Sequence, residues 1–138
     1  MKNALKLIVL AIIFLSACGK QSAENQPNLD SLKTAHQALY NQTMDIHDEV
    51  MPKMDNLYSL KKSLQDSLAN TPQLSAEAKK TIQTRVQRID SASNAMMVWM
   101  RQFNPSDSVT SAAYGEYMKA ELEKVKQVRE VMLKALKN

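Results

Sequence analysis

Thiols, glycines and aromatic residues are scarce in this chain, and each scarcity excludes certain kinds of site, core or partner. Cys18 is the single cysteine among 138 residues, so disulfides within the chain are excluded, and if Cys18 is acylated, cysteine-based metal sites and nucleophiles are excluded as well. Aromatic residues make up 5% of the sequence, so a core has to rely on leucine, valine, isoleucine and methionine. The sequence lacks a basic stripe with interleaved aromatic residues, which argues against nucleic acid as a partner. It also lacks Ser/His/Asp arrangements, glycine-rich phosphate loops and Glu-x-x-His di-iron patterns, and we expect no enzymatic activity.

The apolar run at the start of the chain, residues 7–15, is too short to cross about 30 Å of hydrocarbon as a helix. It follows a basic start and leads into Leu-Ser-Ala-Cys at positions 15–18, which is typical of a bacterial lipobox. We therefore expect residues 1–17 to be a lipoprotein signal peptide. Cys18 would then carry acyl chains such as palmitate, which anchor the protein in a membrane. The expected location is the cell envelope, at the outer membrane and facing the periplasm.

The formal net charge of +4 is partly an export signal, because removing Lys2 and Lys6 with the signal peptide lowers it to +2. Residues 18–28 are polar and show no apolar period, so we expect a flexible tether there. From Leu29 onward apolar residues recur every three to four positions, which indicates helices. The pattern predicts an all-α domain over 29–138, an antiparallel up-down three-helix bundle. Its helices are expected at about 29–70, 75–104 and 108–137, with N-caps near Asn28 or Asp30 and at Ser75.

Pro52 falls inside the first predicted helix, where its ring and its missing N–H predict a kink. One interpretation is that the kink wraps a long helix around two shorter partners. The other is that it opens the bundle locally beside a site.

A stripe of soft side chains surrounds this proline. Four residues follow one another at steps of three, four and three: Met44, His47, Met51 and Met54. They therefore project from one side of the helix, next to the stripe that contains Leu29, Val50, Leu57 and Leu64. If the hairpin folds about position 72, residue 47 lies opposite residue 97. If the next link folds about position 107, residue 97 lies opposite residue 117.

These registers predict one layer that holds most of the methionines and aromatic residues, with Met132 about two heptads away. The layer is expected to contain His47 with Tyr40, Met44, Met51, Met54, Met96, Met97, Trp99, Met100, Tyr114, Tyr117 and Met118.

Two hypotheses account for this composition. Thioether sulfur and imidazole suit Cu(I), so His47 with Met51 or Met44, and a third ligand from Met96, Met97 or Met100, would form a soft-metal site. Trp99 would flank the ion through a cation–π contact. The alternative is that the methionines are adaptable core packing or a pliable groove for another protein. On that view Trp99, Tyr114, Tyr117 and Met118 form an aromatic packing layer, and no cofactor is needed.

Other polar residues near the stripe are expected to play no part in a site. Asp48 and Glu49 follow His47, but successive helical residues project about 100° apart, so they are not expected to converge with His47 on one substrate atom unless the kink rearranges them. His36 is expected to lie at the boundary of the core.

The segments His-Asp-Glu-Val-Met-Pro-Lys-Met at 47–54 and Met-Met-Val-Trp-Met at 96–100 carry a resemblance that covers essentially the mature chain. The chain resembles a family of small lipoproteins from Bacteroidota that often bear the misleading label "viral A-type inclusion protein". The resemblance implies an envelope location and a helical fold, but no particular activity. Together with the lipobox, it favours an envelope lipoprotein that acts as a structural or partner-binding helical module, with soft-metal binding as the alternative. Its partners would be the membrane, through the lipid anchor, and another envelope protein.

Overall fold

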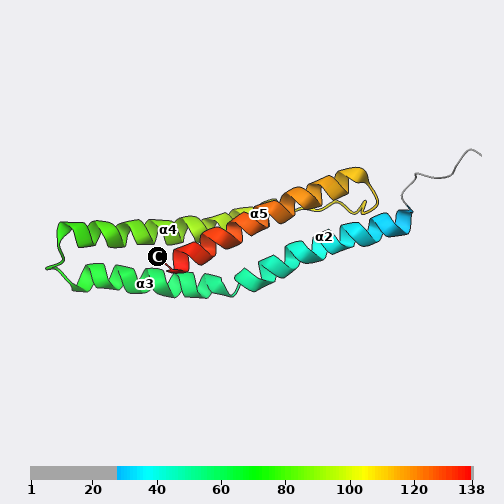
Figure 1. Ribbon diagram of the computed structural model, residues 1–138. Helices are drawn as coiled ribbons and strands as arrows, with labels where there is room; N and C mark the ends of the chain where they lie inside the picture. The colour runs from blue at the N-terminus through cyan, green and yellow to red at the C-terminus, as the bar shows by residue number, and fades with distance from the viewer. Residues whose placement is uncertain (1–27, 138) are drawn as a thin grey trace, which may run out of the picture.

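The computed structural model describes residues 28–137, all of them in helices or the links between helices (Figure 1). The expected signal peptide, the tether up to residue 27 and the acylation site Cys18 lie outside the described residues. The helices are α2 (Leu29–Val50), α3 (Lys53–Asn70), α4 (Ala76–Gln102) and α5 (Ala112–Lys137). The all-α prediction is confirmed.

The helices form the predicted up-down bundle. α2 and α3 make one long bent arm, α4 runs back along it, and α5 returns beside α2 and α4 (Figure 1). α5 therefore runs parallel to α2 and antiparallel to α4. The backbones of α2 and α4 stay farther apart than those of the other packed pairs.

The arm bends at Met51 and Pro52, as the proline predicts. Helical hydrogen bonding continues up to the bend, since the Met51 N–H donates to the His47 carbonyl at 2.8 Å. Val50 and Leu57, one heptad apart on either side of the bend, are both fully buried. The bend thus keeps one apolar stripe turned toward the core.

The helix ends follow local capping rules. The Asn28 side chain accepts from the Asp30 N–H at 3.1 Å, and Ser75 Oγ accepts from the Ala78 N–H at 3.1 Å. Both are expected N-caps. The third predicted helix starts at 112 instead of 108, because 103–111 form a link of turns that ends where Ser111 Oγ accepts from the Tyr114 N–H at 3.1 Å.

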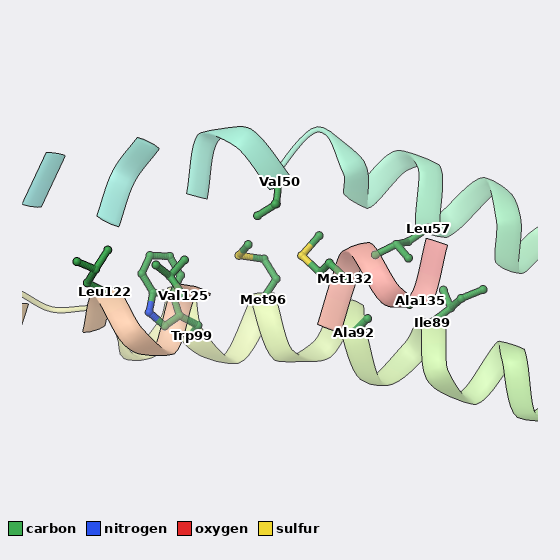
Figure 2. Close-up of a cluster of buried hydrophobic side chains, with 10 residues drawn as sticks. All are labelled: Val50, Leu57, Ile89, Ala92, Met96, Trp99, Leu122, Val125, Met132 and Ala135. Carbon is green, nitrogen blue, oxygen red and sulfur yellow. The ribbon is translucent and has the colours of Figure 1, made fainter. Parts of the chain in front are cut away.

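The core is concentrated in one part of the bundle. Its buried side chains come from all four helical segments (Figure 2): Val50, Leu57, Ile89, Ala92, Met96, Trp99, Leu122, Val125, Met132 and Ala135. α5 ends before the α3–α4 hairpin does (Figure 1), and no residue from 58 to 88 is buried. We call residues 58–88 the two-helix end.

Candidate functional site

A ladder of rings fills the space between α2, α4 and α5. The ring centroids are separated by 5.5 Å for His36–Tyr114, 6.2 Å for Tyr40–Phe103, 6.3 Å for Phe103–Tyr117, 4.9 Å for Trp99–Phe103 and 5.8 Å for His47–Trp99. These separations are those of aromatic pairs in protein cores. Large rings can therefore bridge two helices whose backbones stay apart.

The first expected register agrees with the ladder to within two residues. His47 lies against Trp99, where counting from position 72 places residue 97 opposite it.

The register between α4 and α5 differs from the expected one, which places residue 97 opposite residue 117. The Tyr117 hydroxyl accepts from the Asn104 N–H at 2.7 Å, and the Tyr117 ring faces Phe103. Residue 117 thus lies opposite 103 rather than 97, a shift of about six residues or ~9 Å along the helix. Tyr114, Tyr117 and Met118 consequently lie near the level of Tyr40 and Phe103, and the single compact layer is replaced by an extended ladder.

The same shift brings Met132 toward the methionines of α4. Figure 2 draws Met96 and Met132 at neighbouring positions along the core, and both have 0% exposure. With residue 103 opposite 117, Met132 lies opposite residue 88, about one heptad from the level of Met96 instead of the expected two heptads from the layer. Met118 is also fully buried. These three methionines are core side chains.

His36 is not the boundary residue that its position in the pattern predicts. It is 6% exposed, and its Nδ1 lies 2.6 Å from the Val109 carbonyl oxygen. Because a carbonyl only accepts, Nδ1 carries the proton and donates. The ring packs on Gly115 and beside Tyr114, so it joins α2 to α5. Gly115 was the available sequence signal, since a lone glycine in a helical pattern often marks a close approach.

Met44 and Met51 face α4 from the arm. His47 faces α4, as its contact with Trp99 shows. Met44 precedes His47 by three residues and Met51 follows it by four, so both lie on the same side of the arm. All three side chains are half-buried.

Two exposed methionines of α4 lie, by helical spacing, on the flank of α4 beside the arm. Asp90 forms an ion pair at 2.6 Å with Lys61 of α3, and Met97 lies one heptad further along the same side of α4. Met97 and Met100 are 40% and 37% exposed. We call this surface the methionine edge; it consists of Met44, His47, Met51, Met97 and Met100.

His47 has a carboxylate partner in the next residue. Its Nδ1 lies 2.8 Å from Asp48 Oδ1, so these two neighbouring side chains pair with each other. Glu49 turns to the other side and pairs with Arg129 of α5 at 3.1 Å. A carboxylate on one imidazole nitrogen fixes the ring and leaves the other nitrogen as the ligand atom. Within residues 28–137, no group of three or more His, Cys, Asp or Glu side chains is arranged to hold a metal, so a metal at His47 needs thioether ligands.

The buried charge of Glu121 was not predicted from the sequence. Glu121 is 2% exposed; one carboxylate oxygen accepts from Lys124 Nζ at 2.7 Å, and the other is buried without a partner. The hydrogen bond raises the pKa of Lys124. The position was detectable, because Glu121 follows Met118 by three and precedes Val125 by four on the apolar stripe of α5.

Trp99 Nε1 is likewise buried without a partner. Since Phe103 faces Tyr117, residues 99 and 121 lie opposite each other one turn further into the bundle. The aromatic ladder therefore ends at a level with two buried polar groups that lack hydrogen-bond partners.

Comparison with family models, curated proteins and solved structures gave no match. Among residues 28–137, no helix is apolar over a long enough stretch to cross a bilayer.

Proposed function

We propose that this protein is a lipid-anchored helical module of the bacterial cell envelope that binds another envelope protein through the methionine edge. The proposal includes no catalytic step. The exposure of Met97 and Met100 carries it: these large apolar side chains lie on the flank of α4 beside the arm, and 40% and 37% of their surfaces are open to solvent. Methionine side chains adapt to irregular partner surfaces, and binding surfaces use them for that reason.

The bend at Pro52 supports the same proposal. It lies beside the methionine edge, where the rings of His47 and Trp99 span α2 and α4 while their backbones stay apart. A surface of this kind can repack around a partner without breaking the core below it, which is formed by Val50, Met96 and Met132.

The anchoring part of the proposal rests on the lipobox at Cys18 and on the polar stretch that separates it from Asn28, where α2 is capped. The resemblance to Bacteroidota lipoproteins supports the envelope location. Cys18→Ser should release the protein from the membrane fraction with unchanged helicity, as fractionation and circular dichroism would show. Continued membrane attachment of this variant would contradict acylation at Cys18.

A photo-crosslinking amino acid at position 97 of the full-length chain tests partner binding in cells. We expect a discrete crosslinked species, and loss of that species when Met100→Lys places a charge in the surface. The same amino acid at Gln127, an exposed residue of α5 outside this surface, is the matched control. Equal crosslinking at 97 and 127 would contradict a specific surface at the methionine edge.

The pairing of His47 Nδ1 with Asp48 favours a second candidate function, soft-metal binding at the same edge. In this alternative His47 Nε2 binds Cu(I) together with thioethers of Met44 or Met51, and Met97 or Met100 supplies a third ligand from α4. Met96 is fully buried among apolar side chains and is a poorer ligand than its exposed neighbours.

Cu(I) titration against a competing chelator distinguishes the two functions. A metal-binding protein should take one Cu(I) tightly and bind Zn(II) weakly, because its site offers no thiolate and one imidazole. His47→Ala should abolish the binding and Met118→Leu, a buried methionine on the ladder, should leave it unchanged. Equal competition by wild type and His47→Ala would exclude the metal site and leave the methionine edge as a protein-binding surface.

A further inference from the structure

The two-helix end presents a face that a third helix would cover in a complete bundle. The described part of α5 ends at Lys137, and α3 and α4 extend side by side past that level (Figure 1). Leu57 and Ile89, the last core residues before this section, are 0% and 1% exposed. Beyond them the leucine, isoleucine and valine side chains of α3, the 71–75 link and α4 are only half-buried. They are Leu60, Leu64, Leu68, Leu74, Ile82 and Val86.

Unpaired positive charge accompanies this apolar face. Arg85 precedes Ile89 by one helical turn, so it lies on the core-facing side of α4 at the point where α5 ends. Its Nε is buried without an acceptor. Arg88 and Lys134 line a pocket of about 350 Å³ between α4 and the last turns of α5, together with Val131 and Ala135. Within the part of the chain that the structure describes, Arg85, Arg88 and Lys134 form no ion pair.

We propose that the two-helix end binds an acidic amphipathic helix of another protein, which lies between α3 and α4 in line with α5. An apolar stripe on that helix would cover the leucines of α3, in the manner of helix-in-groove recognition. Carboxylates beside the stripe would meet Arg85, Arg88 and Lys134, where a planar guanidinium can bind a carboxylate through two hydrogen bonds. The open section of α4 from Ala76 to Arg88 is about 20 Å long, which accommodates three to four turns of a helix.

Charge decides between a foreign helix and a second copy of this chain. A two-fold dimer centred on Arg85 and Arg88 would bring these arginines of both copies together, and like charges at an interface oppose association. An acidic partner neutralises them. This surface is separate from the methionine edge, so its test is independent of the proposed function.

Binding can be measured with the full chain in phosphatidylcholine nanodiscs and a labelled synthetic peptide. The probe is an 18-residue helix with leucines at heptad positions a and d and glutamates beside them. A second peptide with lysines in place of the glutamates is the matched control for charge. We expect the acidic peptide to bind one per chain and to gain helicity, and the lysine peptide not to bind. Affinity should fall with added salt, because the charges lie at the surface.

Charge reversal localises the site. Arg88→Glu with Lys134→Glu should weaken binding by at least about tenfold. Lys33→Glu with Arg101→Glu changes the net charge equally at the opposite end of the bundle, where both residues are exposed, and should leave binding unchanged. Leu64→Gln, a substitution in a section without buried residues, should weaken binding while circular dichroism shows the fold intact.

Three outcomes would overturn the proposal. The first is equal binding of the acidic and lysine peptides, or equal effects of the two charge-reversed pairs. The second is a dimer of the free protein that Arg88→Glu with Lys134→Glu alters, which would make a second copy the occupant. The third is failure of the acidic peptide together with protection of the two-helix end by phosphatidylglycerol vesicles in hydrogen exchange, which would make it a membrane contact.

Discussion

The His36 imidazole of α2 lies directly on the backbone of Gly115 in α5, so that a β-carbon on residue 115 would overlap the ring. The ring cannot easily move aside, because Nδ1 donates to the Val109 carbonyl at 2.6 Å. This contact holds the start of α5 and the preceding link against α2. It therefore fixes the level at which α5 begins to pack.

Gly115→Ala should destabilise the protein by about 1–3 kcal/mol through overpacking against His36. In an exposed helix the same change would stabilise the protein by about 1 kcal/mol. The sign of the change in the free energy of unfolding therefore shows whether residue 115 is packed against His36. Urea denaturation measures the free energy of unfolding. In the His36→Ala background, Gly115→Ala should cost less, since the ring is gone. A stabilising Gly115→Ala in the wild-type background would show that the two residues do not touch.

Trp99→Ala should cost about 3–5 kcal/mol, because the indole is 4% exposed and packs in the core cluster. At ~4–8 °C per kcal/mol for a domain near 100 residues, Tm would fall by more than about 10 °C. Met97→Ala, which truncates a large apolar side chain of the same helix that is 40% exposed, is the control and should shift Tm far less. Similar shifts for both variants would place Trp99 outside the core.

Glu121→Leu should raise the free energy of unfolding by about 1 kcal/mol or more. The substitution replaces a buried carboxylate that has one unsatisfied oxygen with an apolar side chain of similar size. Glu123→Leu is the matched control, because Glu123 is exposed and pairs with Lys126 at 2.6 Å. Its effect should stay within about 0.5 kcal/mol. Clear destabilisation by Glu121→Leu would mean that its pair with Lys124 outweighs the cost of burial.

Tyr114 should make stability fall at alkaline pH. Burial raises the pKa of its hydroxyl, and the neighbouring hydroxyls of Tyr40 and Tyr117 raise it further. Above about pH 10 the unfolded chain then loses this proton more readily than the folded protein, so stability decreases as pH rises through that range and is unaffected below it. Denaturation between about pH 8 and 11 should show a smaller loss for Tyr114→Phe. An identical loss would assign the effect to other groups.

Most of the fold was predictable because it depends on short-range rules. The helix boundaries at Leu29 and Asn70 follow from a polar N-cap and a following proline, and the bend follows from Pro52 alone. The register between His47 and Trp99 was predictable within two residues, because the 71–75 link is short and the helices on either side are regular.

The register of α5 was not predictable by counting. The link at 103–111 contains turns held by its own backbone hydrogen bonds, such as Ser111 N–H to the Ser108 carbonyl at 3.0 Å. A symmetrical fold about position 107 ignores these turns. Long-range contacts of His36 with Val109 and Gly115 then set where α5 packs, and such contacts leave no periodic trace in the sequence. The methionine edge was partly predictable. Helical spacing predicts which residues share one side of each helix, but their exposure depends on how far α2 lies from α4.

The early end of α5 also divides the molecule into parts of unequal local stability. Segments with few buried apolar contacts open without global unfolding, whereas segments within a core exchange their amide hydrogens only when the whole domain opens. No side chain from 58 to 88 is buried, so amides around Leu64 and Ile82 should exchange through local fraying of the hairpin. Amides around Val50, Met96 and Val125 should report the global free energy instead. The hairpin tip can thus unwind and reform many times during the lifetime of a single folded molecule.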